Sequence, residues 1–294
     1  MRGDDAVAWV PLGDTDFDDL VALAARCVGA DGGLPLASEP GFVRRRWTAD
    51  GTAGRAGRDA QGRLVAATAV RPSAGGGATV TTLVDPDVRS QGYAAELLDW
   101  SLREAARRVG PVTVETESLT AEQERLFASR GLRQVFAEDV LRIDLTPPVP
   151  PAVWPVGTAL HEWTAETAPR FFRVYDASFR ERPGFPGHPA AMWIEDVEDD
   201  EEFRPGWSVL AEVPGLGDAG FVTAAVGWIV QVGTVPRARG RGLGAALVRE
   251  ALTRMQADGA VEAWLDVNVN NPAKSLYLRL GFKDEGRRAR FERQ

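Results

Sequence analysis

Residues 235–245 have the sequence VPRARGRGLGA, which contains three glycines and three arginines. The preceding segment, Trp228–Val235, is apolar and β-branched and is predicted to form a strand. The following segment, Ala245–Met255, has apolar residues at helical spacing. Glycines let backbone N–H groups approach a ligand closely, and a helix N-terminus adds free donors and partial positive charge. The stretch therefore predicts an anion site, for which phosphate is the usual ligand.

Two well-known phosphate loops are alternatives for this stretch: the nucleotide-hydrolase loop and the dinucleotide fingerprint. A nucleotide-hydrolase loop requires a Gly-Lys-Ser/Thr sequence, which is absent here. A dinucleotide fingerprint is matched by Gly240, Gly242 and Ala245, with Asp266 on a later predicted strand. However, residues 236–239 separate the strand from the first glycine, and too little chain follows to complete a doubly wound sheet. A dinucleotide-binding oxidoreductase therefore remains only as an alternative.

Two sequence blocks carry a resemblance to a known family. In the first block, Arg239, Gly242 and Gly244 match the pattern Arg-x-x-Gly-x-Gly/Ala. The second block, residues 265–282, has the sequence LDVNVNNPAKSLYLRLGF: a strand, asparagines, then a helix with Leu-Tyr that ends in Leu-Gly-Phe. Together the blocks resemble the acetyl-CoA motifs of the GCN5-related N-acetyltransferase (GNAT) superfamily, and one helix and one strand separate them, as in that family.

The resemblance implies where acetyl-CoA binds. The backbone around Val235 would hold the pantetheine arm and the thioester carbonyl, and the loop Arg239–Ala245 would hold the diphosphate. Asn270 or Asn271 would bond the pantetheine or an ordered water; the spacing to Tyr277 leaves both open. The expected binding residues are Thr234, Val235, Arg239, Gly240, Arg241, Gly242, Leu243, Gly244, Ala245, Asn270 and Asn271.

Two side chains are candidates for the chemistry. The resemblance makes Tyr277 the general acid, and a phenol of pKa ~10 is protonated at neutral pH and can give its proton to a leaving thiolate. Gln231 stands near the place where the family often has a glutamate, and an amide cannot take a proton. Asp266 shares a predicted strand face with Asn268 and is the candidate base, directly or through water. A solvent-facing carboxylate at a strand end is the alternative interpretation of Asp266.

Composition excludes several classes of protein. A net charge of −8 argues against a nucleic-acid binder and is compatible with a cationic amine substrate. No apolar run approaches the ~20 residues of a membrane span, and the N-terminus lacks a signal peptide, so we expect a cytoplasmic protein. One cysteine, Cys27, and two histidines make a metal site improbable. Because Cys27 is remote from the motifs, we expect direct attack in a ternary complex with no acyl-enzyme.

A proline-rich segment divides the chain near its middle. Four prolines among residues 147–151 disfavour helix and strand, so the predicted domains are 1–146 and 157–294, with a linker at 147–156. The first domain repeats the motifs weakly: Arg89, Gly92 and Ala94 take the places of the loop residues, and Phe127 takes that of the tyrosine. The fold class is α+β, with two tandem GNAT-like domains, each a mixed, mostly antiparallel sheet flanked by helices. This arrangement resembles mycothiol synthase-like acetyltransferases.

The expected elements follow the same plan in both halves. Two further segments are of functional interest: the loop Phe179–Pro189, as a wall of the acceptor site, and the acidic run Glu195–Glu202, either a solvated stretch or a field for a cationic amine. Helices are expected at Asp16–Cys27, Glu166–Phe179, Ala190–Ile194 and Pro272–Leu280, and strands at Leu64–Val70, Thr79–Val84, Val112–Glu115, Trp207–Val213, Phe221–Val226, Ala263–Val269 and Arg287–Phe291.

The predicted function is acetyl-CoA-dependent N-acetylation of a primary amine on a small molecule. The alternative is a non-catalytic protein that binds or senses acyl-CoA. The acceptor is open among antibiotics, polyamines, amino-sugar thiols and protein N-termini. The first domain is expected to be catalytically silent, and either to pack against the active domain or to hold a second CoA.

Overall fold

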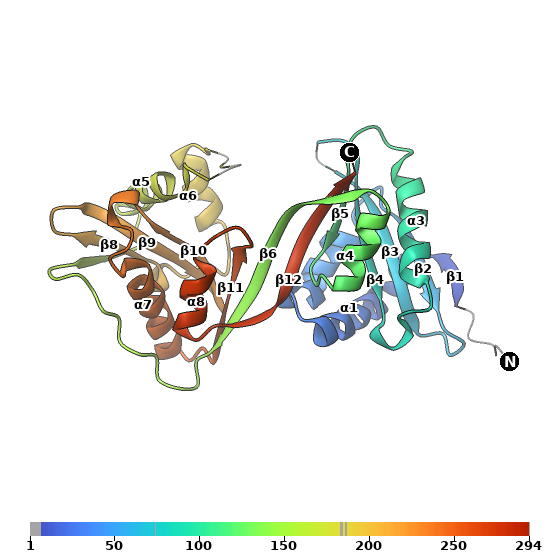
Figure 1. Cartoon of the computed structure of the whole chain (residues 1–294), viewed down its shortest axis with the longest axis horizontal. Helices are drawn as coiled ribbons and strands as arrows, with labels where there is room; N and C mark the ends of the chain where they lie inside the picture. Colours follow the sequence, from blue (N-terminus) through green and yellow to red (C-terminus); the bar gives the residue numbers. More distant parts are fainter. Residues whose placement is uncertain (1–6, 74, 183–184, 186, 294) are drawn as a thin grey trace. The chain divides into compact units, whose positions relative to one another are not determined.

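The computed structural model describes residues 7–73, 75–182, 185 and 187–293. The chain forms two compact units, one of Met1–Val140 with Glu285–Gln294 and one of Leu141–Asp284. Each unit contains a mixed sheet with helices on its faces (Figure 1), which confirms the predicted fold class.

The first unit has its strands in the order β1-β2-β3-β4-β5-β12-β6. Strands β4 and β5 are parallel, while β1–β2, β2–β3, β3–β4 and β5–β12 are antiparallel. Its elements are β1 (Ala8–Pro11), α1 (Phe17–Asp31), α2 (Pro40–Trp47), β2 (Ala53–Arg58), β3 (Leu64–Pro72), β4 (Ala78–Val84), α3 (Tyr93–Ala105), β5 (Val112–Thr116), α4 (Ala121–Ser129), and most of β6 (Leu132–Asp144) and β12 (Lys283–Arg293).

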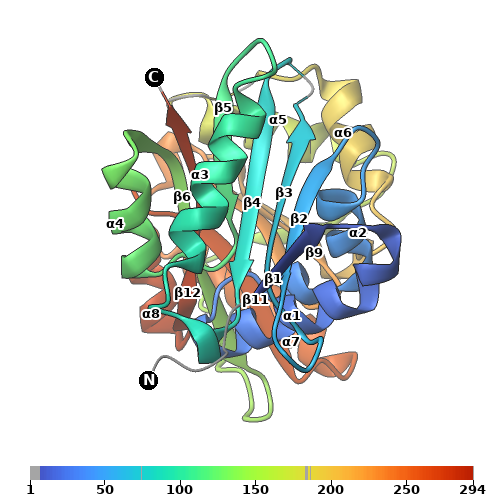
Figure 2. The same cartoon turned by 90° about the vertical axis from the view of Figure 1, so that its right-hand side faces the viewer.

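Alternate residues of β3 show how the helices of this unit are layered. Thr68 hydrogen-bonds Ser101 of α3 across 2.7 Å, whereas Ala67 packs in a buried cluster with Leu20 and Leu23 of α1. Because successive side chains of a strand point to opposite faces, α1 and α3 cover opposite faces of the sheet. Figure 2 shows α3 lying along one face of β3 and β4.

The second unit has the strand order β11-β10-β9-β8-β7, with the end of β6 beside β11. Here Gly220 faces Leu243 and Leu247 of α7, and its neighbour Phe221 packs on Phe171 of α5, so these helices also cover opposite faces. Its elements are β7 (Ala159–Glu162), α5 (Ala168–Phe179), α6 (Ala190–Glu198), β8 (Val209–Val213), β9 (Gly217–Ala225), β10 (Trp228–Thr234), α7 (Leu243–Ala257), β11 (Glu262–Asn268) and α8 (Lys274–Leu280).

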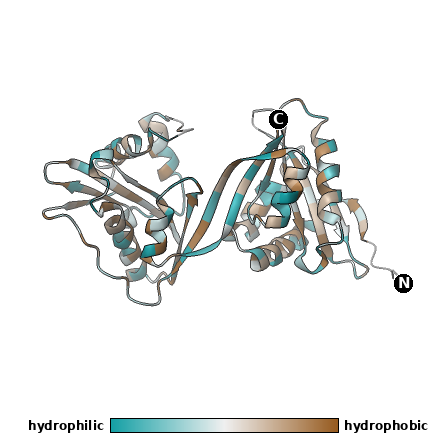
Figure 3. Cartoon of the chain, in the orientation of Figure 1, coloured by the Kyte–Doolittle hydropathy of each residue, from teal (hydrophilic) through white to brown (hydrophobic). Residues whose placement is uncertain are grey.

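Hydropathy follows this layering. In Figure 3 the helices carry alternating hydrophilic and hydrophobic bands, as expected for helices with one face against a sheet. On β11 the alternation is residue by residue: Ala263, Leu265 and Val267 are buried, and Trp264 and Asp266 between them are half-buried. The strand predicted at Ala263–Val269 forms for this reason.

The proline-rich segment is extended, as its composition predicts, but it is also held in place. Residues 146–155 contain no helix or strand. The side chain of Gln256 on α7 donates to the carbonyls of Leu145 and Pro147 and accepts from the N–H of Val149 at 3.2 Å. The segment is therefore fastened along the second unit.

The final strand is where the structure divides the chain differently from the predicted domain limits. The sequence places Arg287–Phe291 in the second domain, but Glu285–Gln294 belong to the first unit. There β12 pairs antiparallel with β5, with Ala289 opposite Thr116 and Phe291 opposite Val114. Conversely, Leu141–Asp284 begins within β6, so the second unit starts before the proline-rich segment.

Candidate active site

The site begins with a bulge in β10. This strand pairs with β9, but the register shifts between Ile229 and Gln231, so that Val230 is an additional residue. A bulge of this kind re-aims the side chains that follow it. Trp228 lies opposite Ala225, and Gln231 lies opposite Thr223, so both point to the same face of the sheet. Gly233 continues that face, which is covered by α5.

Beyond Trp228, strands β10 and β11 separate. The aligned residues of this parallel pair are Trp228 and Trp264 alone, and their indole rings stack at 6.2 Å. In the first unit the corresponding strands β4 and β5 stay aligned over four residue pairs, from Ala78–Val112 to Thr81–Glu115. In the second unit the register ends after one residue pair, and we call the unpaired edges of β10 and β11 beyond Trp228 and Trp264 the gap.

The hydrogen bonds of Val235 decide which amides face this gap. Its N–H donates to the carbonyl of Ala219 at 3.0 Å, and its carbonyl accepts from the N–H of Ala238 at 2.9 Å. Both backbone groups of Val235 are therefore engaged within the unit. Because N–H directions alternate along a strand, the amides of Val232 and Thr234 point toward the gap instead. The sequence analysis named Thr234 for this site and missed Val232.

The glycine-rich turn presents free backbone donors beside the gap. Gly240 and Gly242 have φ values of 76° and 79°, a left-handed conformation that glycine adopts without strain. Helix α7 has no side-chain cap, and its first intrahelical bond runs from Ala246 N–H to the Gly242 carbonyl. The N–H groups of Leu243, Gly244 and Ala245 therefore lack helical partners and form an anion site.

The three arginines of the turn differ in the hydrogen bonds that their side chains make. Arg239 bonds the Glu181 carboxylate and the Ser178 carbonyl, each at 3.1 Å, and so fastens the turn to the end of α5. Arg237 donates to the Leu216 carbonyl at 2.7 Å. The side chain of Arg241 is exposed and makes no hydrogen bond or ion pair with any described residue. Arg241 is thus the guanidinium available to a phosphate at the helix terminus.

Asp266 lies on the face of β11 that carries Trp264, two residues further along the strand. Counting the bulge, the neighbouring position on β10 is Gln231, so these two side chains face the same side at the point where the strands separate. The carboxylate oxygen Oδ1 of Asp266 is shielded from solvent. The structure therefore puts the candidate base on the same face of the sheet as Gln231, beside the point where the strands separate.

The asparagines after β11 shape the turn into α8. Asn268 Oδ1 accepts from the N–H of Asn270, and Asn271 Oδ1 accepts from the N–H of Ala273, both at 3.0 Å. The carbonyl oxygen of the Asn271 side chain is thus used locally, whereas the side chain of Asn270 is exposed. Both remain candidate ligands of acetyl-CoA.

Tyr277 is a buried residue of α8, only 8% exposed, with its ring edge-on to Phe282. Burial raises the pKa of its phenol above the usual value, and the nearby charge of Arg182 lowers this pKa without cancelling the effect. Arg182 lies over the ring of Phe179 at 4.0 Å, in the loop after α5. The phenol therefore stays protonated at neutral pH, as a proton donor must.

An aromatic cluster, here called the aromatic wall, belongs to the hydrophobic core between the sheet and helices α5 and α6. Tyr175 stacks on Trp193 at 4.7 Å, and Trp193 meets Phe221 edge-on at 6.2 Å. A Cβ on Gly233 would come within 2.5 Å of Phe221 and 3.0 Å of Phe179, so only glycine fits there. None of these residues was predicted from the sequence. An isolated glycine inside a strand pattern is nevertheless a signal that another group approaches the backbone closely.

Two other segments were predicted on the acceptor side, the loop Phe179–Pro189 and the acidic run Glu195–Glu202. In the loop Phe179–Pro189, residues 183, 184 and 186 lie outside the described residues. In the acidic run, Glu198 accepts a hydrogen bond from the Trp163 indole at 3.0 Å, while Asp199, Asp200 and Glu202 are exposed.

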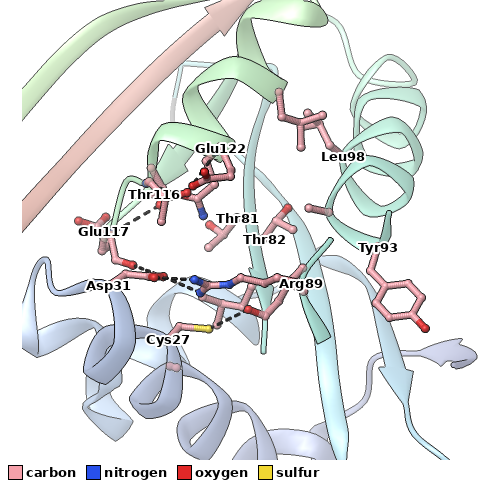
Figure 4. A pocket seen from close by; sticks show the side chains of 18 of the residues that line it. Cys27, Asp31, Thr81, Thr82, Arg89, Tyr93, Leu98, Thr116, Glu117 and Glu122 are labelled. Carbon is pink, nitrogen blue, oxygen red and sulfur yellow. Dashed lines mark hydrogen bonds and ion pairs between the residues drawn. The ribbon is translucent and has the colours of Figure 1, made fainter. Parts of the chain in front are cut away.

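The first unit has a cavity of about 510 Å³ at the corresponding place (Figure 4). Its loop keeps the same shape, since Ser90 and Gly92 have φ values of 66° and 90°. Ser90 is the one non-glycine residue with positive φ in the described chain. Arg89, however, is held by both oxygens of Asp31 at 2.6 Å, as Figure 4 shows. This guanidinium is thus already paired with a carboxylate of the protein.

The chemistry-bearing positions of the first unit are altered. Phe127 stands where the second unit has its tyrosine, and its ring packs on Phe291 of β12 at 4.9 Å. Glu115 stands at the place of Asp266. Burial acts to raise the pKa of Glu115, but the guanidinium groups of Arg46, Arg71 and Arg290 outweigh it and hold this pKa below its usual value. The first unit therefore has no phenol at the position of Tyr277, and the carboxylate at the position of Asp266 is neutralised by arginines.

Residues 158–282 match the Acetyltransferase (GNAT) family. A mycothiol acetyltransferase from Clavibacter michiganensis subsp. michiganensis is 30% identical over 247 residues, covering 81% of this chain and 79% of that protein. The chain is a tandem GNAT acetyltransferase. A mycothiol acetyltransferase from Actinosynnema mirum is 32% identical over 238 residues, covering 76% of this GNAT chain and 73% of that protein.

Solved structures share the fold of this tandem GNAT acetyltransferase over nearly its whole length. A GCN5-related N-acetyltransferase from Sphaerobacter thermophilus superposes with a TM-score of 0.76 at 23% identity, covering 97% of this chain and 95% of that one. A tandem GNAT protein from the clavulanic acid biosynthesis pathway gives 0.63 at 18% identity, covering 97% and 98%.

The described residues contain neither a candidate metal cluster nor a candidate membrane span. No group of three or more His, Cys, Asp or Glu side chains among them is arranged to hold a metal ion. None of the helices in the described part of the chain combines the length and apolar character needed to cross a membrane.

Proposed function

We propose that the second unit transfers the acetyl group of acetyl-CoA directly to the primary amine of a small molecule. The observation that carries the proposal is the gap between β10 and β11, bordered by the amides of Val232 and Thr234 and ending at the uncapped N-terminus of α7. An extended pantetheine arm can hydrogen-bond the free strand edge while the diphosphate binds the helix amides. Arg241 adds a cation to that end.

The acetyl group then lies where the strands separate, between Tyr277 and Asp266. The amine nitrogen attacks the thioester carbonyl carbon, and a backbone N–H of β10 aimed at the oxyanion contributes about 3 kcal/mol. Asp266, directly or through water, accepts a proton from the nitrogen. As the tetrahedral intermediate collapses, the C–S bond breaks and Tyr277 gives its proton to the thiolate sulfur.

An acyl-enzyme is not part of this proposal. Cys27, the one cysteine of the chain, belongs to α1 of the first unit. Burial raises the pKa of its thiol to about 11, so it is a poor nucleophile at neutral pH. Direct attack within a ternary complex is therefore the route we propose.

The first unit is proposed to be silent in catalysis. Phe127 cannot donate a proton, and the carboxylate of Glu115 is bound by arginines. Its loop and cavity keep the shape needed for a second CoA, which we propose as a ligand of this unit.

The decisive experiment is an acceptor screen with acetyl-CoA that reads the release of free CoA thiol. Thiol release with an amine, and an acetylated product by mass spectrometry, are expected. Binding of acetyl-CoA without thiol release from any amine would instead support a non-catalytic acyl-CoA binder. Membership of the GNAT family removes the dinucleotide oxidoreductase that the glycine pattern left as an alternative.

A further inference from the structure

Four buried polar atoms of the second unit make no hydrogen bond with any described residue, and all lie on the α5 face of its sheet. They are Ser178 Oγ, Trp193 Nε1, Thr223 Oγ1 and Gln231 Oε1. Native proteins leave few such groups, and each calls for a partner supplied by a ligand or water. Gln231 is the one of the four that belongs to β10, the strand that borders the gap.

The first unit has a corresponding pair of positions on β4 and β5, and there the two side chains hydrogen-bond each other. Thr81 and Glu115 are directly opposite across β4 and β5, and the Thr81 hydroxyl donates to the Glu115 carboxylate at 3.0 Å. In the second unit the same two places hold Gln231 and Asp266.

The chemistry of the two groups orients the glutamine. A carboxylate only accepts hydrogen bonds, so of the two ends of the Gln231 amide only the nitrogen suits Asp266. The carbonyl oxygen Oε1 cannot bond a carboxylate, and it has no hydrogen-bond partner among the described residues. This leaves a buried acceptor beside the place where the amine must approach the thioester.

We infer that Oε1 of Gln231 accepts a hydrogen bond from the amine that is acetylated, and that it thereby selects primary over secondary amines. The inference rests on the proposed acetyl transfer. A neutral primary amine has a lone pair and two N–H groups: the lone pair attacks the carbonyl carbon, one N–H bonds Gln231, and the other hydrogen is the proton removed by Asp266. A secondary amine has one N–H and cannot satisfy both residues.

The test compares matched amines on the full chain. We measure kcat/KM by thiol release for ethanolamine, phenethylamine and glucosamine, and for the N-methyl derivative of each. The wild type is expected to prefer the primary amine by about tenfold or more, because a buried acceptor left unpaired penalises the wrong substrate. Gln231→Met keeps the size of the side chain and removes the oxygen, and should reduce the preference to within about threefold, chiefly through slower reaction of the primary amine.

Two further variants separate this role from a structural one. Gln231→Glu retains an acceptor oxygen at the site and is expected to keep the preference for primary amines. Thr223→Val removes the buried hydroxyl of the cross-strand neighbour and is expected to leave the ratio of the two substrates unchanged. If Gln231→Met does not fold, Gln231→Asn draws the amide back by one carbon and should lose the preference in the same way.

A Gln231→Met protein that binds acetyl-CoA like the wild type and retains its primary-amine preference would overturn the inference. A wild type that acetylates both members of each pair equally would do the same while leaving the proposed function intact. Thiol release with none of the six amines would contradict the proposed function itself, and the inference with it.

Discussion

Tyr277 combines deep burial with a hydroxyl that we propose as the proton donor to the leaving sulfur, so its substitution should separate binding from chemistry. In Tyr277→Phe the ring keeps its contact with Phe282, and the binding loop is untouched. We expect acetyl-CoA to bind with unchanged affinity and turnover to fall at least about a hundredfold, the usual loss on removing a general acid. Calorimetry measures the first quantity and thiol release the second.

The matched control uses the same substitution at another tyrosine of this unit. Tyr175 is also buried, on the aromatic wall, and Tyr175→Phe retains its stack on Trp193. This variant is expected to stay within about tenfold of wild-type turnover. Wild-type rates in Tyr277→Phe would remove the tyrosine from the mechanism.

At the scale of single residues, the sequence identifies the motif positions but not the directions of their backbone hydrogen bonds. Arg239, Gly242 and Tyr277 stand out as letters in a motif. Val235 stands out in the same way, yet its amide is bonded to β9, and the amides that face the gap belong to Thr234 and Val232. The bulge at Val230 sets this alternation, and no residue type marks a bulge in a β-branched run.

Among the elements, the turn before α7 depends on backbone conformation at Gly242. A Cβ there meets nothing within 4 Å, but φ is 79°, so Gly242→Ala is strained without a clash. We expect this variant to lose about 1 kcal/mol of stability and also to bind acetyl-CoA more weakly, because the relaxing turn moves the amides that receive the diphosphate.

Gly259, at the other end of α7, provides the control for Gly242. It has φ of 90° and equally open space around its Cα, so Gly259→Ala meets the same strain away from the site. Its stability should fall by a similar amount while its affinity for acetyl-CoA stays at the wild-type value. Equal affinities in both variants, measured by calorimetry, would show that the turn is not the diphosphate site.

In the first unit, Glu115 fastens three elements together. It pairs with Arg46 of α2, with Arg71 of β3 at 2.7 Å and with Arg290 of β12 at 3.5 Å. Removing one charge from a buried network leaves the others uncompensated, so Glu115→Gln is expected to lower the free energy of unfolding by about 3 kcal/mol at pH 7. Urea denaturation monitored by circular dichroism gives the value.

The effect of Glu115→Gln should depend on pH in a defined direction. The arginines hold the pKa of Glu115 below its usual value in the folded state, so its contribution is present above the unfolded pKa of about 4.3 and is lost as the pH falls below it. The difference in stability between wild type and variant should therefore be smaller at about pH 3 than at pH 7, and it should vanish only below the lowered folded-state pKa. Glu124→Gln, at an exposed site on α4, should change stability by no more than about 0.5 kcal/mol at either pH.

Elements with strong periodicity were predicted, and those with unusual composition were not. Strands β8 to β11 and helix α7 follow their apolar pattern to within a few residues, whereas the short strand β7 was not predicted. Strand β2 was missed because it consists of alanine, glycine and arginine. It is a strand because the glycines make room for neighbours: a Cβ on Gly57 would lie 2.6 Å from Trp9, and one on Gly54 would lie 2.7 Å from Leu12.

For the molecule as a whole, the limits of the second unit predict which fragment is stable. A fragment of residues 157–294 lacks Leu141 and Leu145, which are 0% and 2% exposed in the core of that unit. It also lacks the bond from Leu145 N–H to the Val261 carbonyl. At about 1.5–3 kcal/mol for each leucine, the loss is comparable to the whole stability of a domain.

We therefore expect the fragment 141–284 to show a cooperative urea transition by circular dichroism, and the fragment 157–294 to be largely unfolded or aggregated. The second fragment additionally carries β12 without β5, its partner in the first unit. A 157–294 fragment as stable as 141–284 would show that residues 141–156, with the end of β6, are dispensable to the second unit.

The overall plan of two similar units was predictable because the motifs occur twice, about half the chain apart. Which sheet the last strand joins could not be predicted. The tail Arg287–Phe291 has the alternation of a strand, and this was predicted, but alternation does not say which sheet a strand joins. That choice is made by partners distant in sequence, such as Glu117, which pairs with both Arg288 and Arg290.

The place of β12 between β5 and β6 also has a consequence for biosynthesis. Domains generally fold as units while the polypeptide emerges from the ribosome, the first before the second. Here the first unit lacks an internal strand until every residue of the second has been translated, so it waits with two open strand edges that invite association with other nascent chains. Its maturation is thereby tied to the completion of the second unit, and a ribosome that stalls in the second half would leave neither a finished first unit nor a finished enzyme.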